Sequence, residues 1–141
     1  KTLKLDPEVE KTLQNLKSKQ TWLVISEGWC GDAAQILPII KLMAEVSENI
    51  DFKIVLRDEN EALMNQFLTN GAKSIPKLLL LDEAFHLINH WGPRPEGAKN
   101  LIIEYKANHG IVDEAAKTAL QKWYLDDKGI STMKEIVAIF Q

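Results

Sequence analysis

The chain has 141 residues, of which 45% are hydrophobic and 26% are charged, and its net charge at pH 7 is −3. This length suits a single domain over residues 1–141, and the composition is that of an ordinary soluble globular protein. The acidic balance offers no basic stripe for a phosphate backbone, so no nucleic-acid partner is expected. No apolar run approaches the roughly 20 residues that cross a bilayer, so no membrane partner is expected either.

The single cysteine, Cys30, rules out an internal disulfide and fits a reducing compartment, so we expect a cytoplasmic protein. The chain begins at Lys1 rather than at a methionine, which leaves open a trimmed N-terminus. The three histidines, His86, His90 and His109, form no familiar metal-ligand spacing with Cys30. No metal site is therefore predicted.

Apolar spacing and turn residues predict an α/β chain in which strands and helices alternate before a helical tail. Strand-length apolar runs lie at 21–26, 51–57, 77–81 and 85–91, after a short edge strand at 3–5. Helical spacing and capping residues predict helices at 7–19, 33–46, 61–69, 96–108, 113–126 and 131–140. The chain thus divides into a core at 1–95 and a helical C-terminal extension at 96–141.

The only cysteine lies in the sequence WCGDA at 29–33, between the first long strand and the second helix. At the start of a helix the first N–H groups lack partners and the helix dipole is positive, which favours a thiolate over a thiol. The carboxylates of Asp32 and Glu27 oppose this effect, because they lie two and three residues from Cys30. The two effects are of similar size, so these residues leave open whether Cys30 reacts or packs as a small apolar side chain.

This stretch resembles the active site of thioredoxins, in which Trp-Cys-Gly-Pro-Cys follows a buried strand and opens a helix that contains a proline. The matching residues are Trp29, Cys30, Gly31, Pro38, Ile75 and Pro76. They occur in the order of the family, with Ile-Pro directly before a strand, and the closest resemblance spans 20–95. The resemblance implies a thioredoxin-like α/β fold, with a central mixed sheet flanked by helices, and a cis bond at the Ile-Pro pair. The extra C-terminal helices predicted at 96–141 make this tail longer than the single closing helix of a minimal thioredoxin.

The resemblance also implies roles for individual residues. Cys30 is the expected catalytic residue. An extended substrate segment would contact the positions around it, which are Trp29, Gly31, Asp32, Ile75 and Pro76. Apart from the resemblance, Arg57 ends the strand at 51–57, whose carboxyl end should face the Cys30 loop. It is a ligand for the carboxylate of glutathione, a support for a thiolate, or a solvated strand end.

Three positions depart from the motif of the family. Asp32 replaces its proline, Ala33 replaces its second cysteine, and Val24 replaces the aspartate that thioredoxins bury in the central strand. In a dithiol enzyme the second cysteine attacks the mixed disulfide and releases the product. Because Ala33 has no thiol, ordinary dithiol activity is not expected.

Two functions follow from these matches and departures. The first is a monothiol thiol-disulfide oxidoreductase, in which the Cys30 thiolate attacks a disulfide or a glutathionylated thiol. The expected partner is an extended peptide or protein thiol or disulfide, or a small thiol. Glutathione or another small thiol would resolve the product as co-substrate, without a bound cofactor. The second is a non-catalytic thioredoxin-fold module that binds a partner at Trp29, Ile75 and Pro76. The retained Trp-Cys-Gly and Ile-Pro favour the first function. The missing thiol at Ala33 and the missing buried acid at Val24 favour the second.

Overall fold

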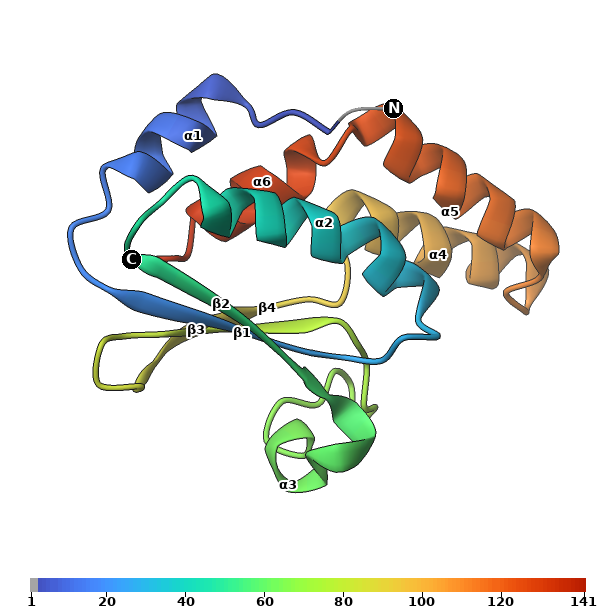
Figure 1. Ribbon diagram of the computed structural model, residues 1–141. Helices are drawn as coiled ribbons and strands as arrows, with labels where there is room; N and C mark the ends of the chain where they lie inside the picture. The colour runs from blue at the N-terminus through green and yellow to red at the C-terminus, as the bar shows by residue number, and fades with distance from the viewer. Residues whose placement is uncertain (1–2) are drawn as a thin grey trace.

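The computed structural model describes residues 3–141, and the four strands in this range form one mixed sheet (Figure 1). The strands are β1 (Gln20–Ser26), β2 (Ile50–Leu56), β3 (Lys77–Leu81) and β4 (Leu87–Trp91), in the spatial order β2-β1-β3-β4. β1 pairs in parallel with β2 and antiparallel with β3, and β3 pairs antiparallel with β4. β1 is therefore a central strand, and its carboxyl end leads into the loop that carries Cys30.

Five of the six α-helices in residues 3–141 lie on one side of this sheet (Figure 1). They are α1 (Pro7–Gln14), α2 (Gly31–Glu45), α4 (Glu96–His109), α5 (Glu114–Asp127) and α6 (Ile130–Val137). The short α3 (Glu61–Met64), preceded by a 3-10 turn at Arg57–Glu59, lies on the opposite side (Figure 1). None of these helices is both long enough and apolar enough to span a membrane.

The larger hydrophobic core lies between the sheet and the five helices. Trp22 and Val24 of β1 and Leu78 and Leu80 of β3 face this side and are fully buried. Phe140, which follows α6, meets the ring of Trp22 edge-on with the ring centroids 6.5 Å apart. The C-terminal helices therefore share one core with the sheet, and burying these side chains is the main source of stability.

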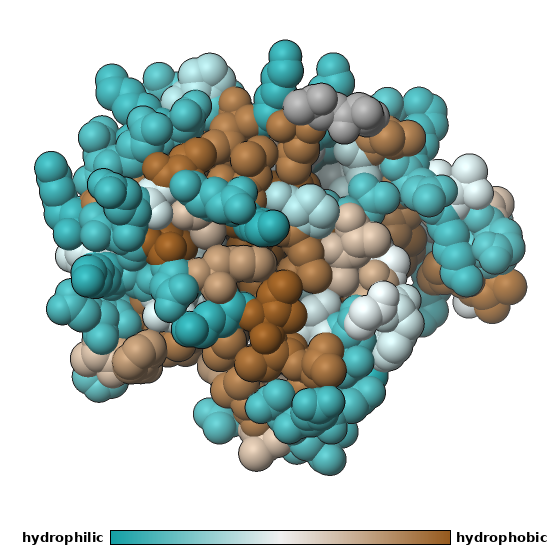
Figure 2. Space-filling view, in the orientation of Figure 1, coloured by the Kyte–Doolittle hydropathy of each residue, from teal (hydrophilic) through white to brown (hydrophobic). Residues whose placement is uncertain are grey.

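The opposite side of the sheet carries a smaller core. Ile25 and Leu79 pack there against Met64 of α3 and against Ile75. Apolar residues also reach the surface: the edge strand β2 exposes Ile54 and Leu56, and Figure 2 shows hydrophobic residues along the middle of the face seen in Figure 1. The helices thus cover the two sides of the sheet unequally.

The predicted helix at 61–69 ends early, at Met64. The reason is the turn that follows it. Asn70 and Gly71 have φ angles of 52° and 80°, and they close a short antiparallel bridge between Thr69 and Ala72. Asparagine and glycine adopt such left-handed conformations readily, so the chain forms this tight turn instead of continuing the helix.

Two other differences concern the N-terminal part of the chain. The predicted strand at 3–5 is wrong, because residues 3–6 have no regular secondary structure. The first helix ends at Gln14 rather than near residue 19, and the Asn49 side chain then binds the Leu16 carbonyl oxygen at 2.8 Å. Pro38 does not interrupt its helix, since α2 runs continuously from Gly31 to Glu45.

Candidate functional site

Cys30 stands at the start of α2, the helix that follows the central strand β1. It is the N-cap of this helix, with φ −76° and ψ 120°, and its Sγ accepts a hydrogen bond from the Ala33 N–H at 3.4 Å. The side chain is partly exposed, and its sulfur lies 3.5 Å from the carbonyl oxygen of Ile75. The sulfur therefore faces the N–H groups at the positive end of a 15-residue helix, a position that stabilises negative charge.

The Ile75 carbonyl belongs to a cis Ile75-Pro76 bond directly before β3, as the resemblance predicted. Both residues are buried, so it is their backbone that is presented to Cys30. A second cis bond, Gly92-Pro93, follows β4 and was not predicted. Gly92 has a φ of 118°, and a Cβ there would overlap the carbonyl oxygen of Pro76. Only glycine fits this close approach of the two proline segments.

Asp32, which replaces the proline of the family motif, is held by two side chains from distant parts of the chain. Arg94 donates from Nε to Oδ1 at 3.1 Å and from Nη2 to Oδ2 at 3.0 Å, which makes a two-point ion pair. The Tyr124 hydroxyl of α5 donates to Oδ1 at 3.1 Å. The side chains of Asp32 and Arg94 are only 16% and 29% exposed. The negative charge of Asp32 is therefore compensated inside the protein.

The pKa values of both partners reflect this contact. Burial alone would lower the pKa of Arg94, but the hydrogen bonds and charge of Asp32 outweigh it and raise that pKa, with smaller contributions from Tyr124 and Cys30. Burial, the charge of Asp32 and its hydrogen bond raise the pKa of Tyr124 well above the ordinary value. Tyr124 is thus a neutral donor at neutral pH. Arg94 is a permanent cation, and it lies close enough to Cys30 for a charge on the sulfur to interact with it.

Trp29, immediately before Cys30, is 66% exposed. The guanidinium carbon of Arg57 lies 5.0 Å from the centre of its ring, which is a cation–π contact. Arg57 also donates from Nε to Asp58 Oδ1 and from Nη1 to the carbonyl oxygen of Lys73, each at 3.1 Å. Arg57 therefore joins Trp29 to the loop after β2, and it is not the solvated strand end that was one of its predicted roles.

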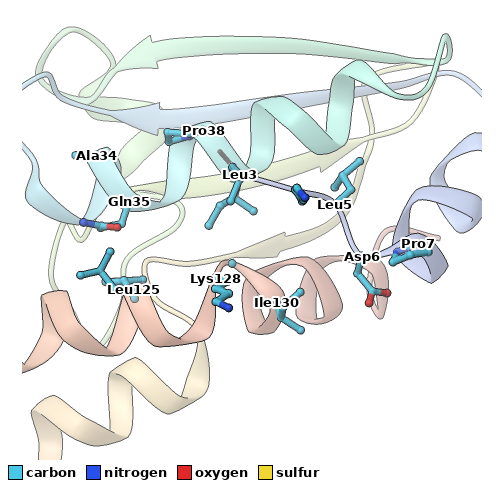
Figure 3. A pocket seen from close by; sticks show the side chains of 14 residues that line it. Leu3, Leu5, Asp6, Pro7, Ala34, Gln35, Pro38, Leu125, Lys128 and Ile130 are labelled. Atoms are coloured by element: carbon cyan, nitrogen blue, oxygen red, sulfur yellow. The ribbon is translucent and has the colours of Figure 1, made fainter. Parts of the chain in front are cut away.

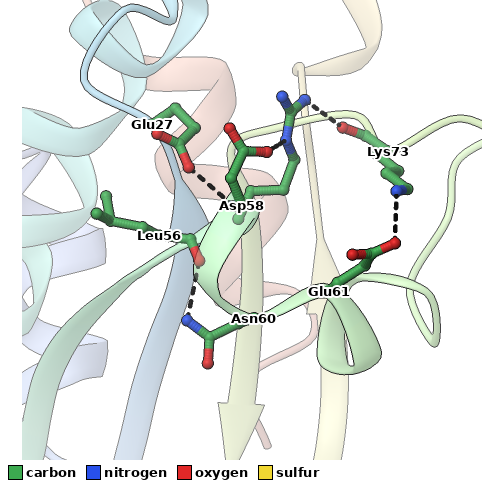
Figure 4. Close-up of polar contacts among 7 residues, drawn as sticks. Glu27, Leu56, Asp58, Asn60, Glu61 and Lys73 are labelled. Carbon is green, nitrogen blue, oxygen red and sulfur yellow. Dashed lines mark hydrogen bonds and ion pairs between the residues drawn. The ribbon is translucent and has the colours of Figure 1, made fainter.

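Glu27, the other carboxylate near Cys30 in sequence, is engaged by the same loop (Figure 4). Its Oε2 accepts a hydrogen bond from the backbone N–H of Asp58 at 2.9 Å. The Asn60 side chain donates to the Leu56 carbonyl oxygen at 2.9 Å, which fixes the same turn. Both carboxylates that were expected to oppose a thiolate at Cys30 therefore have hydrogen-bond donors of their own.

Of the remaining motif positions, Gly31 is exposed, whereas Ala33 and Val24 are buried. Gly31 is exposed in the first turn of α2, and no atom lies within 4 Å of the position of a Cβ there. Ala33, at the position of the second cysteine of the family, is buried, and Val24 is fully buried in the larger core. These two positions therefore supply neither a second thiol nor a buried carboxylate.

An apolar cavity of about 690 Å³ lies between the N-terminal segment, α2 and the junction of α5 with α6 (Figure 3). Its apolar lining includes Leu3, Leu5, Pro38, Leu125 and Ile130. Tyr124 also borders it, so the side chain that binds Asp32 forms part of this cavity wall. The C-terminal helices thus contact α2 both at the polar network and at an apolar surface.

Arg94 and Tyr124 are the residues of this site that sequence reasoning missed, and they lie 62 and 92 positions from Asp32. Sheet topology explains the meeting with Arg94. β1 and β4 are both antiparallel to β3, so their carboxyl ends lie at the same edge of the sheet. A usable signal was the aspartate in the first turn of the helix that follows the central strand, because a carboxylate shielded from water needs a donor or a cation.

A mixed sheet, a helix that opens at a cysteine, and a cis-proline that faces this cysteine define the thioredoxin-like class of α/β folds. A family model described as Thioredoxin matches residues 1–107. The chain therefore belongs to the thioredoxin family. Helices α5 and α6 lie beyond the matched residues, although α5 supplies Tyr124 to the candidate site.

Solved structures share this fold. A protein of unknown function from Pseudomonas aeruginosa is 22% identical, with a TM-score of 0.72, over 96% of this chain and 74% of that one. An HIV epitope-scaffold is 24% identical, with a TM-score of 0.70, over 96% of this chain and 73% of that one. A domain of alkylhydroperoxide reductase from Enterococcus faecalis is 17% identical, with a TM-score of 0.50, over 68% and 45%. These likenesses concern the fold alone. Comparison with curated proteins gave no match.

Proposed function

We propose that this member of the thioredoxin family carries out monothiol thiol-disulfide exchange at Cys30. The observation that carries the proposal is the position of the sulfur. It is partly exposed at the N-terminus of α2 and lies against the backbone of the cis Ile75-Pro76 segment. A thiolate is the attacking species in disulfide exchange. A helix N-terminus stabilises such a charge by about 0.3–1 kcal/mol at the surface and by up to about 2 kcal/mol when partly buried.

The exchange has two steps. In the first, the Cys30 thiolate attacks the glutathione sulfur of a glutathionylated thiol; a disulfide forms between Cys30 and glutathione, the substrate disulfide breaks, and the substrate thiolate leaves and takes a proton from water. In the second, the thiolate of another glutathione attacks this mixed disulfide, which forms oxidised glutathione and returns Cys30 as a thiolate. The external thiol replaces the missing thiol at Ala33. Because the exchange needs reduced small thiols, we place the protein in a reducing compartment such as the cytoplasm.

Arg94 and Tyr124 make this reaction compatible with the aspartate at position 32. A free carboxylate at about 6 Å from a thiolate would oppose it by close to 3 kcal/mol at an effective dielectric constant near 20. The two-point ion pair with Arg94 and the Tyr124 hydrogen bond offset that charge. We therefore assign Asp32, Arg94 and Tyr124 as positioning residues that act through the surroundings of Cys30.

The substrate segment is proposed to lie across Trp29 and the cis Ile75-Pro76 backbone. Trp29 offers an exposed aromatic face held by Arg57, and such a face suits a peptide or the apolar part of a small thiol. The backbone next to Cys30 offers hydrogen-bonding groups to an extended segment. Gly31 and Asp32 complete the edge of this surface.

Binding without turnover is the second candidate function. It is favoured by the buried methyl group of Ala33 where a resolving thiol would stand, together with the exposed Trp29. In this case the same surface would hold an extended partner segment, and Cys30 would not react. The two candidates make opposite predictions for Cys30→Ser: exchange would be lost, whereas binding without turnover would be retained.

The test is glutathione-dependent reduction of a glutathionylated peptide, followed by the formation of oxidised glutathione. We expect the wild type to accelerate the reaction, with a glutathione adduct on Cys30 detectable by mass spectrometry. In Cys30→Ser we expect no acceleration but an unchanged thermal midpoint, because serine is itself a good helix N-cap. A wild type no faster than Cys30→Ser would reject exchange and leave the binding module as the function to pursue.

A further inference from the structure

A second cavity, of about 430 Å³, lies where β3 and β4 meet the start of α4. Lys77 lines this cavity; it is the first residue of β3 and directly follows Pro76. Lys77 is buried, and its Nζ donates to Thr69 Oγ1 and to the Gly92 carbonyl oxygen, each at 2.9 Å. An ammonium group has three hydrogens. With these two acceptors found within residues 3–141, one N–H of a buried ammonium group remains for a ligand.

Two lysines and a histidine from three elements meet at this cavity. Burial, and after it the charge of Lys99 on α4, lower the pKa of Lys77. Burial, and after it the charge of Lys77, lower the pKa of His90 on β4. All three residues line the cavity. The ammonium groups of Lys77 and Lys99 therefore repel each other across a shared space, and a bound anion would relieve that repulsion. His90, whose pKa is lowered, is neutral at neutral pH and is a polar neighbour of the two lysines.

The carboxylates that line the cavity, Glu96 and Glu135, form no ion pair with these lysines among residues 3–141. Glu135 uses one oxygen to accept from Trp91 Nε1 and the other to accept from the backbone N–H of Glu96, both at 2.8 Å. Arg94, which also lines the cavity, gives its charge to Asp32.

The start of α4 adds to the positive potential. Its N-cap is Pro95, which has no side-chain group to accept a hydrogen bond from the first turn. Glu135 satisfies only the N–H of Glu96. The first turn of a 14-residue helix therefore presents further N–H groups and a positive dipole end near a cavity that Glu96 and Lys99 line.

We propose that this cavity binds an anionic oxygen group, a carboxylate or a phosphate, with Lys77 and Lys99 as its ligands. The two groups share the chemistry that the site recognises, which is negative charge on oxygens that accept hydrogen bonds. The cavity borders the candidate site through Arg94 and through the chain from Pro76 to Lys77. Binding of the anion nevertheless needs no thiol, so the proposal is independent of exchange at Cys30.

The test is a titration of the isotope-labelled protein with sodium phosphate and, separately, with sodium acetate, followed by NMR at constant ionic strength. We expect at least one anion to give saturating shifts confined to the amides of Lys77, His90 and Lys99 and to the ring of His90. Acetate alone would assign the site to carboxylates, and phosphate alone to phosphates. Neither solution contains a thiol, so failure here would leave the proposed exchange unaffected.

Substitutions distinguish a specific anion site in this cavity from non-specific attraction of anions to surface lysines. Lys99→Met removes an exposed side chain and should weaken binding about tenfold, because a charge-assisted hydrogen bond contributes on the order of one decade in affinity. Lys106→Met is the matched control, since it removes the same charge two turns along α4 outside the cavity, and binding should be unchanged. Lys77→Met should abolish saturation in protein that retains its fold by circular dichroism. The absence of saturating shifts in the wild type, or equal weakening by Lys106→Met, would overturn the proposal.

Discussion

Two arginines, Arg94 and Arg57, contact residues close to Cys30 in sequence. Their own side chains are similarly exposed, but the carboxylates that they bind are not. The side chain of Arg94 is 29% exposed and that of Arg57 is 21% exposed. Arg94 binds Asp32, which is 16% exposed, whereas Arg57 binds Asp58, which is 64% exposed. Each arginine therefore pairs with an aspartate, but the carboxylate bound by Arg94 is shielded from water and the one bound by Arg57 is exposed.

This difference predicts two roles. An ion pair whose carboxylate is shielded from water keeps its strength and becomes costly to break, whereas a pair with an exposed carboxylate is worth little. Arg94 should therefore control the charge next to the sulfur and contribute to folding. Arg57 should mainly orient Trp29, with a small contribution to stability.

The largest effect on stability is expected from Arg94→Met. The change leaves the shielded carboxylate of Asp32 with the Tyr124 hydroxyl as its remaining donor. Breaking a fully buried pair costs about 3–5 kcal/mol, and partial exposure reduces this to about 2 kcal/mol. The free energy of unfolding from urea titration, followed by circular dichroism, measures the loss. A cost no larger than that of Arg57→Met would show that partner exposure does not separate the two pairs.

The second prediction concerns the pH dependence of stability, to which Tyr124 contributes through its hydrogen bond with the shielded Asp32. The folded-state pKa of Tyr124 is raised above its unfolded value of about 10, so its contribution is complete below about pH 10 and is lost as pH rises further. The slope is at most about 1.4 kcal/mol per pH unit for one proton. In Tyr124→Phe this loss is absent, so the difference in unfolding free energy between the two proteins should shrink above about pH 10. A constant difference would contradict the raised pKa.

At neutral pH, Tyr124→Phe should cost about 1.5 kcal/mol of unfolding free energy, the lower end of the contribution of one hydrogen bond to a charged group, because the ring is retained. Arg94 still holds both oxygens of Asp32 in this variant, so the loss is smaller than for Arg94→Met. Differential scanning calorimetry provides the comparison. Tyr105→Phe is the matched control, because its hydroxyl binds the exposed Asp113 and its removal should change stability by less.

The smallest effect is expected for Arg57→Met. An exposed cation–π contact is worth about 0.5–1 kcal/mol, and the Asp58 pair adds little. We expect a loss of less than about 1 kcal/mol, accompanied by a change in the emission of the exposed Trp29. Trp29→Phe identifies that part of the fluorescence signal. An unchanged emission in Arg57→Met would argue against a role of Arg57 in holding the ring.

The sequence predicted those parts of the fold that depend on local pattern. Apolar runs placed β3 at its observed bounds and the other strands near theirs, and capping residues placed the start of α1, where Asp6 is the N-cap. The errors arose where local pattern is ambiguous. A helix-like spacing continued past Met64 into a turn set by Asn70 and Gly71, and the apolar residues at 3–5 pack without joining the sheet.

The candidate site was only half predictable, for a physical reason. The helix cap at Cys30 and the cis Ile75-Pro76 bond follow from residues close together in sequence or from the family motif. Asp32 was interpreted as a charge that opposes a thiolate because its partners come from the loop after β4 and from α5. Contacts of this range depend on how the strands and helices pack, which periodicity does not encode.

The most direct test of the central claim is the rate of alkylation of Cys30 by neutral iodoacetamide between pH 5 and 9. The wild type, Arg94→Met and Arg57→Met should be compared under the same conditions. Removal of a nearby cation and exposure of the Asp32 charge should slow the reaction of Arg94→Met at pH 7 by about tenfold, equivalent to about 1.4 kcal/mol. Arg57→Met should react at nearly the wild-type rate. Equal rates for the wild type and Arg94→Met would contradict the claim that Arg94 offsets Asp32 at a reactive thiol.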